Sequence, residues 1–221
     1  MSPDLLQTLV RTIELKDHST AAHTWRVVLY TRAMAERFGL DRGRIESLTA
    51  GAALHDIGKL EIPDEILRKP GRLTPEEFEV IKTHPVRGHE RLVSMGETDP
   101  IVLGLVRHHH ERTDGTGYPD GLGGAEIPLS ARYFAVIDTF DALTSLRPYR
   151  AEAGPHAAPA AVEELRAGIG TRYDAECVEA FIDLYARGEL TWILEYFNDT
   201  SCALPFCPMR ANETAKTDRR S

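Results

Sequence analysis

We predict an all-α fold, a single helical bundle, on three observations. Apolar residues recur three and four positions apart along nearly the whole chain, which is the helical period. No stretch alternates apolar and polar residues for more than a few positions, as a half-buried strand would. With 221 residues, 42% of them hydrophobic and 27% charged, the chain can bury a sizeable core without disulfides. We expect one domain over residues 1–187, then a C-terminal helix and a mobile tail over 188–221.

The N-terminal helices follow from apolar spacing and from the residues that end each run. Leucine, valine and isoleucine at helical spacing predict a first amphipathic helix over 5–13. A second helix is expected over 20–38 and ends at Gly39, a residue type that commonly terminates helices. A third covers 45–57, and its small apolar segment LTAGAAL indicates that it is buried.

Prolines mark the starts of the next helices. Pro63 opens a short helical turn, and Thr74 followed by Pro75 forms a capped start with two glutamates in the first turn. Further helices are expected to begin at His84 and at Pro100. A glycine-rich loop covers 112–129, the Pro/Ala-rich stretch 155–168 is assigned no element, and the last helices are expected over 130–146, 174–187 and, from the segment ELTWILEYFNDT, 189–200.

Composition and charge argue against several classes of protein. The net charge of -8 disfavours non-specific binding to a nucleic-acid polymer or an anionic membrane. No apolar run approaches the length of a membrane span, and the N-terminus lacks the apolar core of a signal peptide. The three cysteines, Cys177, Cys202 and Cys207, are too few and too uneven for a disulfide framework. We therefore expect a reduced, soluble, cytoplasmic protein that would meet an anionic ligand with a local cluster of cations or metals.

Histidines and aspartates stand out by their grouping. His55 precedes Asp56 at the end of the third helix, and His109 precedes His110 just before the glycine-rich loop. Asp138 lies in the apolar run YFAVID, where an ionised carboxylate is costly to bury unless a cation compensates it. Each of these residues alone is more often a capping or core group. Two further histidines complete the set, His23 and His84.

Taken together, these residues indicate metal ligands. Imidazole and carboxylate bind borderline divalent ions such as manganese, iron and zinc. Six or seven ligands are more than one tetrahedral ion uses, so two ions are implied. Asp56 is the natural bridge, because His55 fixes it beside one ion and a carboxylate can span a two-metal site. Lys59 shares the helical face of Asp56, and a phosphate oxygen between Lys59 and the ions would offset their repulsion.

Five segments in order resemble the HD-GYP domain, a branch of the HD phosphohydrolase superfamily. They are HDIGK at 55–59, IPDEILRKPGRLTPEE at 62–77, THP at 83–85, HHERTDGTGYP at 109–119 and RYFAVIDTFDALTSLRPYR at 132–150. The resemblance spans roughly residues 8–187 and implies a helical bundle around a binuclear or trinuclear centre of iron or manganese. It implies metal ligands at His23, His55, Asp56, His84, His109, His110 and Asp138.

The resemblance also implies contacts to a substrate. Lys59 would contact the scissile phosphate, so Asp56 and Lys59 are the catalytic candidates. Tyr118 of the GYP segment would contact the rest of the dinucleotide, as would Arg147 and Arg150 of RPYR, whose planar guanidinium groups suit phosphate or the edge of guanine.

One position departs from the trinuclear members of the family. They carry a glutamate one helical turn before the first histidine, where this chain has Ser19. Because a hydroxyl is a poorer ligand than a carboxylate, we predict a binuclear centre. Near the ligands, we expect His108 to be a neighbour only, Glu111 to orient a ligand histidine, and Arg112 with Asp114 to brace the loop.

For function, the resemblance implies hydrolysis of cyclic di-GMP to pGpG, and in some members on to GMP, by a hydroxide that bridges two divalent ions. Two alternatives stay open. The same site would act on another cyclic dinucleotide such as cyclic GMP-AMP, or the chain would bind a cyclic dinucleotide as a sensor and signal through a protein partner docked on the GYP loop. A nucleotidase-like HD hydrolase is disfavoured by GYP and RPYR. The first helix and residues 189–197 are candidate contacts for a homodimer.

Overall fold

The computed structural model describes residues 2–17, 21–145 and 154–198. Within these residues the fold is a helical bundle without strands, and the predicted all-α class is confirmed. The helices are α1 (Pro3–Lys16), α2 (Ala21–Arg37), α3 (Arg42–Leu54), α4 (Asp64–Leu67), α5 (Pro75–Ile81), α6 (His84–Ser94), α7 (Pro100–His108), α8 (Leu129–Thr144), α9 (Ala158–Ala167), α10 (Ala175–Ala186) and α11 (Thr191–Asn198), with 3-10 turns η1 (Ile57–Glu61), η2 (Gly124–Glu126) and η3 (Gly154–His156).

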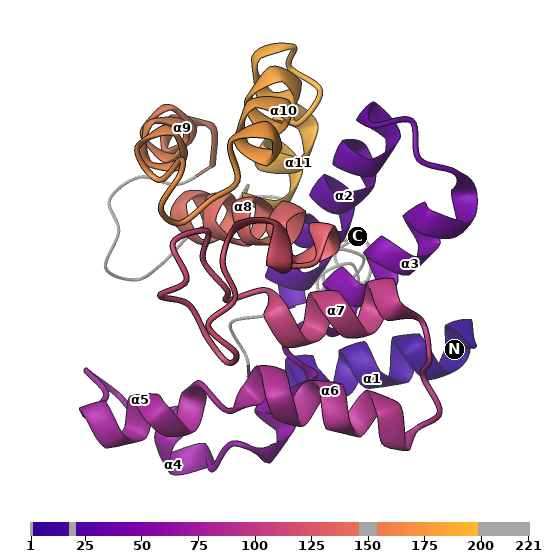
Figure 1. Ribbon diagram of the computed structural model, residues 1–221, viewed down its shortest axis with the longest axis vertical. Coiled ribbons are helices and arrows are strands. Elements are labelled where there is room, and N and C mark those ends of the chain that lie inside the picture. Colours follow the sequence, from indigo (N-terminus) through magenta and orange to yellow (C-terminus); the bar gives the residue numbers. More distant parts are fainter. Residues whose placement is uncertain (1, 18–20, 146–153, 199–221) are drawn as a thin grey trace, which may run out of the picture.

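Two groups of helices pack against each other across the middle of the bundle (Figure 1). α9, α10 and α11 gather over α8, while α1, α6 and α7 lie on the other side, and α2 and α3 connect the two groups. α3 packs on α2 and α7, and α6 packs on η1 and α7. The short α4 and α5 project beyond the N-terminal end of α6. This arrangement brings the ends of α3, α6 and α7 together with α2 and α8.

Local signals explain where helices start and stop. The Asp41 carboxylate accepts the backbone N–H of Arg44 at 3.0 Å and caps α3. At α5 the predicted capped start is present, because the Thr74 hydroxyl accepts the N–H of Glu77 while the Glu77 carboxylate accepts the N–H of Thr74. Gly39 follows α2 with φ +65°, a left-handed conformation that glycine adopts without strain.

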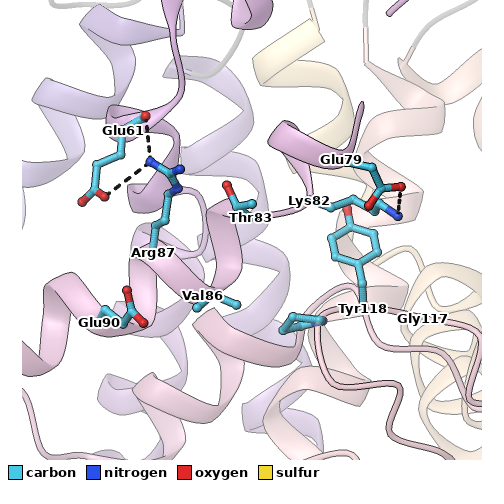
Figure 2. Close-up of a pocket in the computed structure, with 10 residues that line it drawn as sticks. Glu61, Glu79, Lys82, Thr83, Val86, Arg87, Glu90, Gly117 and Tyr118 are labelled. Carbon is cyan, nitrogen blue, oxygen red and sulfur yellow. Dashed lines mark hydrogen bonds and ion pairs between the residues drawn. The ribbon is translucent and has the colours of Figure 1, made fainter. Parts of the chain in front are cut away.

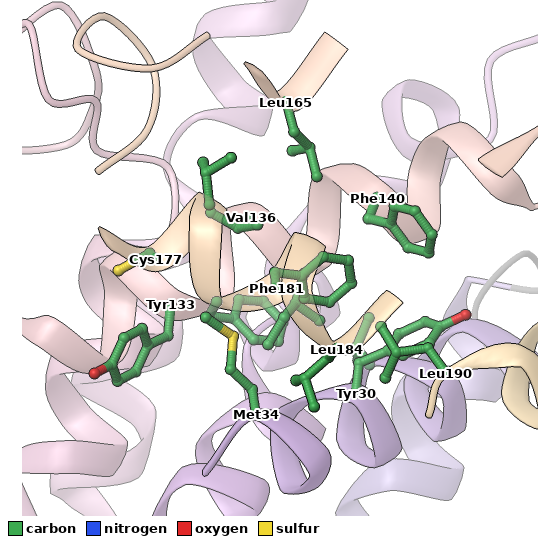
Figure 3. Close-up of a cluster of buried hydrophobic side chains, with 14 of the residues drawn as sticks. Tyr30, Met34, Tyr133, Val136, Phe140, Leu165, Cys177, Phe181, Leu184 and Leu190 are labelled. Atoms are coloured by element: carbon green, nitrogen blue, oxygen red, sulfur yellow. The ribbon is translucent and has the colours of Figure 1, made fainter. Parts of the chain in front are cut away.

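The larger hydrophobic cluster joins α2, α8, α9, α10 and α11 (Figure 3). Tyr30, Phe140 and Phe181 meet edge to face at its centre, with ring centroids 4.9 to 6.0 Å apart, a favoured aromatic geometry. A smaller cluster under α3 and η1 contains the following buried residues: Ile13, Leu54, Ile57, Leu92, Val102 and Val106. Leu54 and Ile57, on either side of His55 and Asp56, belong to this smaller cluster. His55 and Asp56 are therefore held where the smaller cluster adjoins the helices of the larger cluster.

The structure departs from the sequence prediction in three helices. α3 ends at Leu54, and the chain tightens into η1 instead of continuing to Ile57. α7 ends at His108, two residues before the predicted end. The Pro/Ala-rich stretch forms α9, because a proline is tolerated in the first helical turn and Leu165 is among its buried anchors.

The C-terminal segment contributes to the core as far as the structure describes it. Ile193 and Leu194 of α11 are buried in the larger cluster, whereas Trp192 is 53% exposed. Cys177 is buried on α10, and Cys202 and Cys207 lie outside the described residues. Among the described residues, no helix is both long and apolar enough to cross a membrane.

Candidate metal centre

Five helices and η1 bring the predicted ligands to one place at the centre of the bundle. His23 lies on α2, His55 and Asp56 join α3 to η1, His84 opens α6, His109 and His110 follow α7, and Asp138 lies on α8. η1 can approach α6 only because residue 58 is glycine. A Cβ on Gly58 would lie 1.9 Å from the carbonyl oxygen of His84 and 2.6 Å from the amide nitrogen of Gly88. This close approach places Asp56 beside His84.

The seven residues form two groups of three with Asp56 between them. His23, His55 and Asp138 make one group, and His84, His109 and His110 make the other, with ligand atoms within 4.8 Å of one another in each group. One Asp56 oxygen lies 3.2 Å from Nε2 of His55, and the other lies 3.4 Å from Nε2 of His84. The Asp56 carboxylate therefore faces both groups at once.

Most of the histidines present Nε2 to the centre because their other ring nitrogen is already bonded. Nδ1 of His55, His84 and His109 lies 2.8 to 2.9 Å from the backbone carbonyl oxygen three residues earlier, so Nδ1 carries the proton and donates. The same tautomer puts a bare Nε2 lone pair on each ring. Nε2 of His84 then faces Nε2 of His109 at 3.2 Å with no proton for a hydrogen bond. Opposed lone pairs of this kind fit a shared cation, so the residues present suit a divalent metal.

His23 is held differently, by a carboxylate. Its Nδ1 lies 2.7 Å from Oδ2 of Asp141, which is completely buried on α8. Arg26 donates to both Asp141 oxygens at 2.5 and 3.0 Å and to the Ser145 hydroxyl at 2.6 Å. Hydrogen bonds from His23 and Arg26 outweigh the cost of burial and lower the pKa of Asp141 to about 2.

Most groups of the site favour the protonation states that bind metals. His55 is the exception, because burial lowers its pKa but the Asp56 carboxylate outweighs burial and raises it. Burial lowers the pKa of His84, lowers that of His109 well below its usual value, and lowers that of His110 to about 4. Burial alone would raise the pKa of Asp56, but His55 and Lys59 outweigh it and hold this pKa well below its usual range. Neutral imidazole and ionised carboxylate are the forms that a divalent ion requires.

Two predicted substrate contacts border the centre. Nζ of Lys59 lies 2.7 Å from Oδ2 of Asp56 and 3.5 Å from Oδ2 of Asp17. The Tyr118 ring lies on the His110 ring, with centroids 4.8 Å apart and planes 33° apart. Tyr118 also forms part of a pocket of about 710 Å³ between α5, α6 and the glycine-rich loop. Lys82 and Arg87 line this pocket, and each is turned to a partner, Lys82 to Glu79 and Arg87 to Glu61 (Figure 2).

Comparison with known proteins assigns the chain to a family. The sequence profile of the family described as HD domain matches residues 7–177. The chain belongs to the HD domain family. The family prediction made from the motifs is thereby confirmed.

Two curated relatives of this HD domain are each 42% identical to it over 200 residues. One is the "Cyclic di-GMP phosphodiesterase response regulator RpfG" of Xanthomonas campestris, with 90% of this chain and 51% of the relative covered. The other is the "Cyclic di-GMP phosphodiesterase" of Thermotoga maritima, with 90% and 53% covered. The chain spans about half the length of these relatives. A solved structure of the cyclic GMP-AMP specific phosphodiesterase V-cGAP3 of Vibrio cholerae shares the fold, with TM-score 0.66 and 18% identity over 89% of this chain and 50% of that one.

Several predicted positions of the HD domain fall outside the described residues. These are Ser19, Arg147 and Arg150. The predicted loop brace is present, because Arg112 donates to both oxygens of Asp114 at 3.1 and 2.7 Å.

The prediction for Glu111 is wrong. Its carboxylate does not orient a ligand histidine and instead accepts the backbone N–H groups of Asp120 at 2.7 Å and Leu122 at 3.1 Å. His108, Glu111 and Asp120 lie close enough together to suggest a third metal group. Glu111 is bonded to the loop backbone and Asp120 is paired with Arg107, so both carboxylates already have partners in the loop and on α7.

Sequence reasoning also missed Asp141 and Arg26. Asp141 follows the predicted ligand Asp138 by three residues, so both project from the same face of α8. A second aspartate in the apolar segment FDAL was the signal that could have found it.

Proposed function

We propose that this HD domain is a metal-dependent phosphodiesterase that linearises cyclic di-GMP to pGpG. One observation carries the proposal, namely that the two oxygens of Asp56 face two separate groups of three ligands. The names of the two relatives that are 42% identical to the chain support cyclic di-GMP as the substrate.

We propose that the centre holds two divalent ions, iron or manganese, one in each group, with Asp56 shared between them. Histidine and carboxylate ligands suit both metals. When bound, the ions would lower the pKa of a coordinated water and polarise the phosphoryl group.

The chain's own residues would position the substrate around this chemistry. Lys59 can exchange its contact with Asp56 for a non-bridging phosphate oxygen, where its charge stabilises the transition state. Burial and hydrogen bonds hold the histidine rings in place, so little reorganisation accompanies the reaction. Tyr118 offers a ring face on the pocket side of the centre, suited to a purine base. We propose that Arg147 and Arg150 contact the remainder of the dinucleotide.

The test is metal content measured together with hydrolysis, on protein purified without oxygen and assayed with iron(II) or manganese(II). About two ions per chain with pGpG or GMP as product supports the proposal. Bound metal and measurable dinucleotide binding without turnover would instead support a sensor that signals through a protein partner on the GYP loop.

Cyclic GMP-AMP is a second candidate substrate, because one relative of the chain is named for it. The chain is 35% identical over 183 residues to the "3'3'-cGAMP-specific phosphodiesterase 2" of Vibrio cholerae, with 82% of this chain and 34% of the relative covered. Parallel assays with cyclic GMP-AMP and cyclic di-GMP separate the two substrates by their kcat/KM values.

We also propose a homodimer and a cytoplasmic location. Sedimentation of the same preparation tests the homodimer, and fractionation of cells tests the location.

A further inference from the structure

The buried carboxylate of Glu111 has an unusual set of partners. It is the residue after His110, and its side chain is fully buried. Among the described residues no lysine or arginine forms an ion pair with it. Its two oxygens instead accept two backbone N–H groups of the glycine-rich loop, one oxygen binding Asp120 and the other binding Leu122. The Glu111 carboxylate therefore holds the backbone of the loop just after Tyr118 and Pro119.

Gly117 of the loop also lies in close contact with the backbone of Glu111 and Arg112. A Cβ on Gly117 would lie 2.4 Å from the amide nitrogen of Arg112 and 2.5 Å from Cα of Glu111, so this contact requires glycine. The N–H of Tyr118 donates to the carbonyl oxygen of His110 at 3.2 Å. The loop segment that carries Tyr118 thus rests directly on the segment that carries two predicted ligands.

An outer ion pair closes the same turn of the loop. Both oxygens of Asp120 accept from Arg107 on α7, each at 2.8 Å, in the bidentate geometry that fixes both partners. Asp120 is held through its side chain by Arg107 and through its backbone by Glu111. Two independent attachments therefore tie the residues after Pro119 to the end of α7.

From this geometry we propose that Glu111 is a positioning residue for Tyr118. It holds the loop so that the Tyr118 ring lies on His110 and forms the wall shared by the metal centre and the pocket of Figure 2. Glu111 would act on binding of a cyclic dinucleotide, whose bases extend past the reacting phosphate, and not on the bond-breaking step. This inference rests on the proposed function.

The test is Glu111→Gln, which keeps the size of the side chain but replaces one acceptor oxygen with an amino group. One loop N–H then faces another donor, so we expect amide exchange of Asp120 and Leu122 to rise about tenfold or more, as for loss of a buried hydrogen bond. KM for cyclic di-GMP should rise by about the same factor. The kcat/KM for bis(p-nitrophenyl) phosphate, a small diester without bases, should change by less than about twofold, because it does not use the Tyr118 wall.

Two further variants sharpen the test. Asp120→Asn weakens the Arg107 pair without disturbing the buried site, and it should shift exchange and KM in the same direction by less. Glu126→Gln is the matched control, since Glu126 is exposed in the same loop and, among the described residues, its carboxylate accepts only the N–H of Gly123, at 3.3 Å. In this control, amide exchange of Asp120 and Leu122 should equal that of the parent chain. So should the hydrolysis of cyclic di-GMP and of bis(p-nitrophenyl) phosphate.

The outcomes separate this inference from the proposed function. Unchanged amide exchange in Glu111→Gln overturns it, and so does faster exchange with unchanged KM for cyclic di-GMP. Parallel loss of bound metal and small-diester turnover also overturns it, because Glu111 would then support the metal centre itself. If the parent chain hydrolyses neither diester, the proposed function fails, while amide exchange still decides whether Glu111 holds the loop.

Discussion

Asp141 accepts a hydrogen bond from Nδ1 of His23 at 2.7 Å, across 118 residues of sequence. His55, His84 and His109 are oriented by backbone carbonyls, so His23 differs from them in having a charged partner. A carboxylate makes the imidazole a stronger electron donor than a carbonyl does. The group of His23, His55 and Asp138 should therefore bind its ion more tightly than the group of His84, His109 and His110.

Asp141→Asn should weaken metal binding at the His23 group specifically. Loss of such a partner typically costs about 10- to 100-fold in metal affinity. It also leaves the buried Arg26 without its counterion, so we expect the free energy of unfolding to fall by about 3 to 5 kcal/mol. Competition with a chelator measures the affinity, and denaturant unfolding of metal-free protein measures the stability.

Asp183→Asn is the control for that variant, because Asp183 pairs with Arg37 and Arg187 on the surface. Exposed pairs contribute about 0 to 1 kcal/mol, so this change should be near neutral. An Asp141→Asn protein that binds both ions with the parent affinities would contradict a role for Asp141 in orienting His23.

Asp56→Ala should abolish turnover, since it removes the carboxylate that faces both ligand groups. We expect kcat to fall by at least about a thousandfold and the bound metal to fall from about two ions per chain toward one or none. Inductively coupled plasma mass spectrometry and a product assay measure the two quantities. Asp64→Ala, on the surface of α4, is the control. Metal-dependent hydrolysis that survives in Asp56→Ala would rule out the scheme.

Lys59→Ala should separate catalysis from metal binding. Nζ of Lys59 contacts Asp56 but cannot ligate a metal while it is protonated, and Asp56 and Asp17 outweigh burial to raise its pKa. We expect kcat to fall by about 10²- to 10³-fold with metal content unchanged, because the variant loses one charge at the developing transition state. Lys69→Ala, whose partner Glu77 lies away from the centre, serves as the control. Unchanged turnover with unchanged metal would exclude a role for Lys59.

The ligands could be predicted because the adjacent pairs His55-Asp56 and His109-His110, and Asp138 in an apolar run, are visible in the sequence. The helix ends were predicted less well, since α3 ends at Leu54 and α7 at His108. α9 was missed because prolines and alanines obscure a helix whose burial depends on contacts with α8 and α10. The partners of Asp141 and Glu111 could not be predicted for a different reason. Asp141 meets residues more than 100 positions away, and Glu111 binds loop backbone, which has no sequence signature.

Gly58→Ala should damage the metal centre through sterics alone. The added Cβ would lie 1.9 Å from the His84 carbonyl oxygen, so η1 and the start of α6 must move apart, carrying Asp56 away from His84. We expect weaker binding of the ion at His84, His109 and His110, and destabilisation of about 1 to 3 kcal/mol from overpacking. Gly43→Ala is the control, because its Cβ would meet only a carboxylate oxygen of Asp41 at 3.3 Å. Metal titration and thermal unfolding of both variants check the prediction. Parent-like metal affinity in Gly58→Ala would show that the contact between η1 and α6 does not set the geometry of the centre.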